Sequence, residues 1–210
     1  MSQKLIIFDM DGTLVNSSIT IANAINYVRK KISLPPMSQQ KILSLVNDHT
    51  INPARQFYES DTFMPQYEKW FTEYYSRHHQ NELELYEGIK ELLETLKKRA
   101  YLLAIATNAY RASTIETLTH LEIDKYFNAI ACYDDVAKGK PHPDMLYKLL
   151  DDLGQSHTNS LFVGDGPRDE MAAKAAKIEY KMVDWGFTEH TQREVVISVD
   201  ALKKSLLGEL

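Results

Sequence analysis

The alternation of short apolar runs with one-sided helical patterns constrains the fold of this chain more than any other feature. Apolar runs are followed by stretches in which leucine or isoleucine recurs at every third or fourth position, as in Ile89–Leu96 and Leu146–Leu153. Strands that alternate with amphipathic helices predict a parallel β-sheet with helices on both faces. The expected strands are Leu5–Phe8, Tyr101–Ala106, Ala129–Cys132, Ser160–Val163 and Tyr180–Val183.

Residues 16 to 83 interrupt this alternation and contain no convincing strand. Helical stripes run through Ile21–Val28 and Tyr67–Tyr74, and eight of the 21 aromatic residues lie between Phe57 and Tyr75. Such a concentration is typical of the core of a separate helical domain, with a dimer interface as the alternative. We therefore predict an α/β fold: a doubly wound parallel sheet from residues 1–15 and 84–210, with an all-helical domain inserted at residues 16–83.

Composition limits the partners of the chain. The 210 residues carry a net charge of −5 without a long run of one sign, which argues against a nucleic-acid interface. No apolar stretch approaches the length of a membrane helix, and no signal peptide precedes Lys4. The single cysteine, Cys132, excludes an internal disulfide, so we expect a cytoplasmic protein with no nucleic-acid or membrane partner. A monomer and a homodimer both fit the sequence.

Carboxylates follow two of the expected strands. Asp9 and Asp11 end the first strand just before Gly12, and the segment "GDGPRDE" supplies Asp165 and Asp169 after the fourth. Ligands of parallel α/β sheets bind at the carboxyl ends of the strands. Carboxylates that share one site raise each other's pKa unless a cation lies between them, and oxygen ligands suit Mg²⁺. Turns and helix caps that simply favour aspartate are the alternative.

Two further segments carry groups that suit an anion. The second expected strand is followed by Thr107 and Asn108, which combine a hydroxyl, an amide and the N–H groups of a helix start. Lys138 and Lys140 precede two prolines in "KGKPHPDM", where a lysine could neutralise a phosphoryl oxygen. Taken alone, each is as easily a helix cap or a solvated lysine, but together with the strand-end carboxylates they predict a site for a phosphate group.

The ordered set of motifs resembles the haloacid dehalogenase-like hydrolase superfamily, over nearly the whole chain. "DMDGTLV" looks like its first motif, Thr107 its second, Lys140 its third and "GDGPRD" its fourth. The helical insertion after the first motif, "YEGIKELLETLKKR" and "WGF" at Trp185–Phe187 are similar to the phosphoglycolate phosphatase-like branch. The resemblance implies a Rossmann-like core with an inserted helical cap domain.

The resemblance also implies roles for the motif residues. Asp9 would attack phosphorus and form an aspartyl-phosphate, and Asp11 would protonate the leaving alcohol and then accept a proton from water. Asp9, the backbone carbonyl of Asp11 and Asp165 would bind Mg²⁺, with Asp169 as a ligand or as the partner of one. The residues expected to hold the phosphoryl oxygens are Thr107, Asn108 and Lys140.

The activity that follows is hydrolysis of a small phosphate ester, as by a phosphoric monoester hydrolase. Asp11 favours phosphate esters over dehalogenation, and Thr13 favours hydrolysis over the sugar-phosphate mutases of this superfamily. Two alternatives stay open: such a mutase, and a regulatory or binding protein that keeps the scaffold without turnover. The retained motif residues argue against the second.

The inserted domain is expected to close over the core and supply specificity. His49, Asn52 and Arg55 are the candidates for facing the substrate, and Arg55 could bind a second anionic group, although a solvated arginine is the alternative. Asn47, in the same loop, stands where relatives often carry glycine. Asn16 likewise replaces an aspartate that is common after the first motif. The substrate is therefore not defined by these residues.

Overall fold

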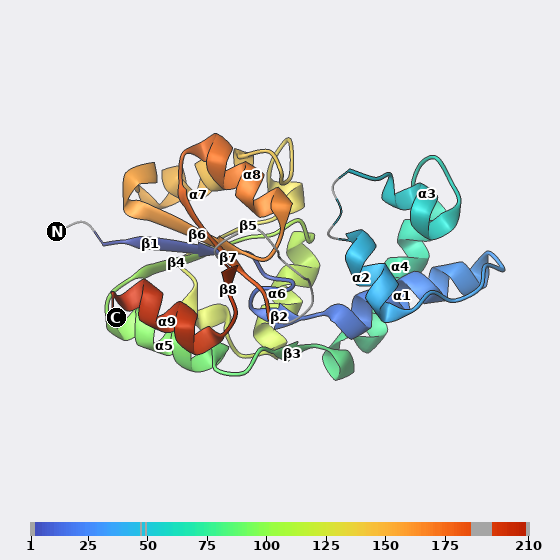
Figure 1. The fold of residues 1–210 in the computed structure, drawn as a ribbon, viewed down its shortest axis with the longest axis horizontal. Helices are drawn as coiled ribbons and strands as arrows, with labels where there is room; N and C mark the ends of the chain where they lie inside the picture. The colour runs from blue at the N-terminus through green and yellow to red at the C-terminus, as the bar shows by residue number, and fades with distance from the viewer. Residues whose placement is uncertain (1–2, 47, 49, 186–194, 209–210) are drawn as a thin grey trace. The chain divides into compact units, whose positions relative to one another are not determined.

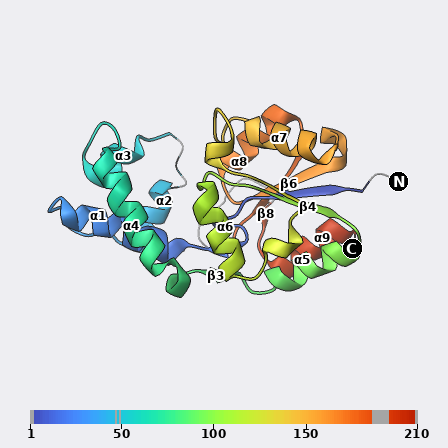
Figure 2. The same cartoon turned by 180° about the vertical axis from the view of Figure 1, so that it is seen from behind.

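The computed structural model describes residues 3–46, 48, 50–185 and 195–208. The chain divides into two compact units, one formed by Met1–Val15 and Leu85–Leu210 and the other by Asn16–Glu84 (Figures 1 and 2). It passes between them at two short strands that pair with each other, β2 (Val15–Asn16) and β3 (Glu84–Leu85). Among the described residues, no helix has both the length and the apolar character needed to cross a bilayer.

The first unit is built on a six-stranded sheet with the order β5-β4-β1-β6-β7-β8, in which neighbouring strands are parallel. From β1 the chain adds β4 and β5 on one side of the sheet, and then returns to add β6, β7 and β8 on the other side. The direction in which strands are added therefore reverses beside β1. This confirms the predicted doubly wound parallel sheet; β8 was not predicted. The strands are β1 (Leu5–Phe8), β4 (Leu102–Ala106), β5 (Ala129–Ala131), β6 (Ser160–Gly164), β7 (Glu179–Val183) and β8 (Val195–Val196).

Helices cover both faces of this sheet, as Figure 1 shows. Helices α7 (Asp144–Leu153) and α8 (Pro167–Ala176) lie on one face, and α5 (Ile89–Lys98) and α9 (Val199–Leu207) on the other. The predicted stripe of α5 is fully buried, because its four apolar residues recur on one side of the helix. The other helical segments are α6 (Arg111–His120) and the short 3-10 turns Asp124–Tyr126, Tyr133–Asp135 and His157–Asn159.

The second unit is helical and has its own apolar core. Its helices are α1 (Ser18–Lys31), α2 (Gln39–Val46), α3 (Pro53–Tyr58) and α4 (Pro65–Glu82). Phe57 and Tyr58 are buried in a cluster with aliphatic residues of α1 and α2, and Trp70 packs against it from α4. Buried Arg29 donates hydrogen bonds to the carbonyl oxygens of Pro35 (2.7 Å) and Phe57 (2.5 Å), which ties the loop after α1 and the end of α3 to α1.

Candidate active site

Asp9 follows the carboxyl end of β1 and begins a tight turn. Asp9 is buried directly after the strand, and the N–H groups of Leu14 and Val15 both donate to the carbonyl oxygen of Met10 at 2.9 Å. Gly12 has φ +81°, and a Cβ atom there would lie 2.2 Å from Oδ2 of Asp165. Glycine is therefore required at this position, and its lack of a side chain lets Asp165 approach the turn.

Three carboxylates from separate elements meet at this edge of the sheet. The three residues are Asp9 after β1, Asp165 after β6 and Asp169 in the first turn of α8. One carboxylate oxygen from each lies within 4.8 Å of the other two. Asp169 packs against Gly164 and accepts a hydrogen bond from the N–H of Gly166 at 3.1 Å. The side chain of Asp11, half-buried two residues after Asp9, is not a member of this group.

Lys140 is the cation of the cluster. Its Nζ lies 2.5 Å from Oδ1 of Asp9 and 2.6 Å from Oδ1 of Asp169, and the residue is 7% exposed. The same Nζ lies 5.5 Å from the ring centroid of Phe162. Through its two ion pairs, Lys140 connects the segment after β5 to the carboxylates of β1 and α8. Lys138, the other lysine of this segment, is exposed.

The negative charge of the site exceeds what Lys140 neutralises. Burial raises the pKa of Asp9 to about 7; Lys140 opposes this rise, while Asp169 and Asp11 add to it. Burial and the charges of Asp9 and Asp169 also raise the pKa of Asp165 well above its ordinary value. Burial lowers the pKa of Lys140, but the two carboxylates outweigh it and raise that pKa overall. A cation is the group that such a cluster can hold.

Thr107 and Asn108 lie where the sequence predicts, at the carboxyl end of β4. Thr107 is buried, and its hydroxyl oxygen accepts a hydrogen bond from the N–H of Ala109 at 3.1 Å. The amide of Asn108 bonds twice to the backbone of Lys140, donating to its carbonyl at 2.9 Å and accepting from its N–H at 2.8 Å. Asn108 therefore orients the lysine, and its predicted contact with a phosphoryl oxygen stays a prediction.

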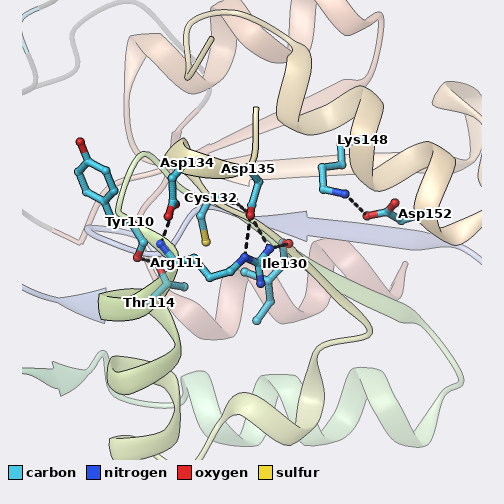
Figure 3. Close-up of polar contacts among 9 residues, drawn as sticks. All are labelled: Tyr110, Arg111, Thr114, Ile130, Cys132, Asp134, Asp135, Lys148 and Asp152. Carbon is cyan, nitrogen blue, oxygen red and sulfur yellow. Dashed lines mark hydrogen bonds and ion pairs between the residues drawn. The ribbon is translucent and has the colours of Figure 1, made fainter. Parts of the chain in front are cut away.

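Arg111, which no sequence motif marks, holds the segment leading to Lys140. Figure 3 shows Arg111, at the start of α6, reaching Asp135 with both sides of its guanidinium group. Its Nε lies 2.7 Å from Oδ1 of Asp135, and another nitrogen donates to the carbonyl of Ile130 at 2.7 Å. The backbone N–H of Arg111 also donates to Asp134 at 2.8 Å. These bonds tie the segments after β4 and β5 together.

We expect Arg111→Met to lower the free energy of unfolding by about 1 kcal/mol, because a bidentate, partly buried ion pair is lost. Phosphate release should also slow by roughly threefold or more, since the segment carrying Lys140 loses an anchor. Urea unfolding and steady-state kinetics measure the two effects.

Lys148→Met is the matched control. It breaks the neighbouring Lys148–Asp152 pair of Figure 3, an exposed pair on α7 that is expected to contribute less than about 0.5 kcal/mol. Equal effects of the two substitutions would contradict a special role for Arg111.

The candidates in the helical unit have local partners. Asn52 caps α3 by accepting from the N–H of Arg55 at 3.2 Å, and it donates to the carbonyl of Asp61 at 2.8 Å. Arg55 forms an exposed ion pair with the carboxylate of Asp61, which an anionic substrate would have to replace. His49 and Asn47 lie outside the described residues. A contact of these residues with substrate stays a prediction.

The fold and the site together define a class of protein. A doubly wound parallel sheet places a buried aspartate beside its winding reversal, where a lysine and two more carboxylates converge. This is the position at which parallel α/β proteins bind their ligands, and the groups are those that hold a cation and an anion.

Comparison with known proteins identifies the family. The family model described as "Haloacid dehalogenase-like hydrolase" matches residues 6–183. A phosphoglycolate phosphatase of Haemophilus influenzae (strain 86-028NP) is 32% identical over 194 residues, which cover 88% of this chain and 87% of that protein. The crystal structure of a predicted phosphoglycolate phosphatase from Haemophilus somnus 129pt has a TM-score of 0.77 and 31% identity, covering 88% of this chain and 86% of that one.

Another relative carries a different name. The pyrophosphatase PpaX of Oceanobacillus iheyensis is 28% identical over 185 residues, covering 88% of this chain and 85% of that protein. The chain belongs to the haloacid dehalogenase-like hydrolase family, in its phosphoglycolate phosphatase-like branch. The predicted family and the predicted enzyme class, a hydrolase of the phosphatase type, are confirmed.

Proposed function

We propose that this protein is a Mg²⁺-dependent phosphatase that hydrolyses a small phosphorylated metabolite through an aspartyl-phosphate. The observation that carries the proposal is the buried Asp9 at the end of β1, in contact with Lys140 and grouped with two further carboxylates. The names of the relatives support phosphate-ester hydrolysis, and phosphoglycolate is the first compound to test. We further propose a cytoplasmic enzyme that acts as a monomer or a homodimer.

The chemistry assigns one task to each group. A carboxylate oxygen of Asp9 attacks phosphorus, and the bond between phosphorus and the ester oxygen breaks while Asp11 gives that oxygen its proton. Asp11 then takes a proton from water, whose oxygen attacks phosphorus and releases phosphate from Asp9. The hydroxyl of Thr107 and the ammonium group of Lys140 hold the phosphoryl oxygens and balance their charge.

The donor set fits a divalent cation. Asp9, Asp165 and Asp169 present clustered carboxylate oxygens, and a hard cation takes such ligands. Burial and the neighbouring carboxylates raise the pKa values of Asp9 and Asp165, so a cation there would relieve their repulsion. We propose that these side chains, with the backbone carbonyl of Asp11, hold Mg²⁺, with Asp169 either a ligand or the partner of one. When bound, Mg²⁺ would neutralise charge on the transferred phosphoryl group.

The helical unit is proposed to act as the cap that selects the substrate. Its boundary at residues 16–83, as predicted, differs by one residue from the compact unit Asn16–Glu84. His49, Asn52 and Arg55 are the residues proposed to contact the part of the substrate that leaves with its alcohol oxygen. Closure of such a cap would shed water from the site.

Phosphate release tests the proposal. The wild type should hydrolyse p-nitrophenyl phosphate with Mg²⁺ and lose this activity in EDTA, and a panel with phosphoglycolate, sugar phosphates, nucleotides and pyrophosphate should rank its substrates. Asp11→Asn should form the phosphorylated enzyme from p-nitrophenyl phosphate, because nitrophenolate leaves without a proton, but should hydrolyse it slowly. Intact-protein mass spectrometry would detect the added phosphoryl group.

Two results would count against this function. One is a folded wild type that releases no phosphate from any compound with Mg²⁺. The other is activation by a sugar bisphosphate with transfer of phosphate instead of release, which would favour the mutase.

A further inference from the structure

Tyr180 reaches the turn that carries Asp165. It lies on β7, and its ring packs against Phe162 of the neighbouring strand β6, with ring centroids 6.0 Å apart. Its phenol oxygen lies 2.9 Å from the carbonyl oxygen of Gly164 and 3.3 Å from that of Gly166. These two carbonyls flank Asp165 in the chain, so a single O–H group contacts the backbone on both sides of the aspartate.

The turn at Asp165 is restrained from several directions at once. The N–H of Gly166 donates to Asp169, and the carboxylate of Asp165 lies so close to Gly12 that no Cβ atom fits there. These contacts limit where the side chain can go, and the bonds from Tyr180 limit how the backbone can turn. The phenol thus restrains the backbone on both sides of Asp165, while the other contacts restrain its side chain and the start of α8.

The phenol group of Tyr180 is protonated and acts as a hydrogen-bond donor to these carbonyl oxygens. Burial raises the pKa of Tyr180, and the nearby carboxylates of Asp169, Asp165 and Asp9 raise it further. The group therefore keeps its proton at neutral pH and can donate to a carbonyl oxygen.

We propose that Tyr180 is a positioning residue for the metal: its O–H group holds the Gly164–Gly166 backbone so that Asp165 presents its carboxylate to a divalent cation. The inference rests on the proposed Mg²⁺ site. Neither the strand pattern nor the motifs predict this role, because the phenol acts on a segment 14 to 16 residues earlier in the chain. Residues that orient metal ligands in this way commonly change metal affinity when they are replaced.

Tyr180→Phe tests the role because it removes one oxygen and keeps the ring against Phe162. Thermal unfolding of the full chain without substrate, followed across a Mg²⁺ titration, gives the Mg²⁺ concentration for half of the full stabilisation. We expect Tyr180→Phe to raise this concentration by roughly tenfold relative to the wild type. The matched control is Tyr147→Phe, which removes a phenol that donates to the carbonyl of Ala175 at 3.1 Å on the exposed side of α7. It should leave the midpoint unchanged.

Each other outcome decides against the role. An unchanged Mg²⁺ midpoint in Tyr180→Phe, or an equal rise in Tyr180→Phe and Tyr147→Phe, would overturn the positioning role. In either case the phenol of Tyr180 would affect metal binding no more than the phenol of Tyr147 does. A Tyr180→Phe variant that does not fold would assign the phenol to general stability and overturn it as well. A wild type that Mg²⁺ does not stabilise would overturn the proposed metal site itself and the role of Tyr180 with it, whereas the first two outcomes would overturn the role of Tyr180 alone.

Discussion

Asp9→Asn is expected to reduce phosphate release by at least about 10⁴-fold, because an amide does not act as the nucleophile toward phosphorus. Substrate should still bind, since Thr107 and Lys140 remain in place, and the KM should change far less than kcat. A phosphate-release assay at saturating substrate, with Mg²⁺ and with EDTA, measures the loss. Asparagine also keeps the shape of aspartate, so the effect isolates the charge and nucleophilicity of one oxygen.

The same substitution should leave the protein folded and change how its stability depends on pH. The pKa of Asp9 is raised to about 7 from an ordinary value of 3.8, so between these values the folded protein holds a proton that the unfolded chain has released. Without metal, the free energy of unfolding of the wild type should therefore fall as pH rises from about 4 to about 7. Asp9→Asn removes this ionisation, so its stability should fall less over the same range in EDTA.

Urea unfolding at pH 5 and pH 8 in EDTA provides the comparison. Asp124→Asn is a suitable control, because Asp124 is an exposed aspartate before β5 that is not part of the acidic cluster. Retention of substantial phosphate release by Asp9→Asn would rule out Asp9 as the nucleophile, whatever the stability data show.

The sheet and the acidic edge could be predicted because they depend on local patterns. Strands buried on both faces are continuous apolar runs, and the end of such a run is visible in the sequence as a change to polar residues. Asp9, Thr107 and Asp165 are each the first polar residues after such a run, which is why their positions at the sheet edge could be predicted. In the part of the chain that the structure describes, the two-residue strands β2, β3 and β8 carry too little pattern to be recognised.

The contacts that orient the site could not be predicted in the same way. Arg111 pairs with Asp135, 24 residues away, and Tyr180 contacts the carbonyl oxygens of Gly164 and Gly166, 16 and 14 residues earlier, so neither has a sequence spacing that marks it. The two bonds between the amide of Asn108 and the backbone of Lys140 likewise have no signal in the sequence, while the contact of Asn108 with a phosphoryl oxygen stays a prediction. Sequence pattern places a residue on an element, but the partner of a polar side chain depends on which elements become neighbours in space.

The difference between two neighbouring lysines illustrates the same limit. Lys138 and Lys140 both precede the prolines, and the structure buries only Lys140 between Asp9 and Asp169.

Lys140→Met should lower the free energy of unfolding by about 3–5 kcal/mol in EDTA, because it leaves buried carboxylates without their cation. It should also lower kcat by about 10²–10³-fold, the usual effect of losing one charged contact to the transition state. Lys138→Met, two residues away and exposed, should change neither quantity appreciably.

The pH and metal dependence separate this electrostatic explanation from a simple packing defect. Lys140 lowers the pKa of Asp9, so in Lys140→Met that carboxyl should keep its proton to a higher pH. The destabilisation in EDTA should then be smaller at pH 5, where Asp9 is protonated in both proteins, than at pH 8, where only the wild type has Lys140 to stabilise the ionised carboxylate. Mg²⁺ should recover part of the lost stability at pH 8, since it supplies positive charge to the same carboxylates, but should not restore kcat. A loss of stability that is the same at both pH values and insensitive to Mg²⁺ would show that Lys140 stabilises the fold through packing and not through its charge.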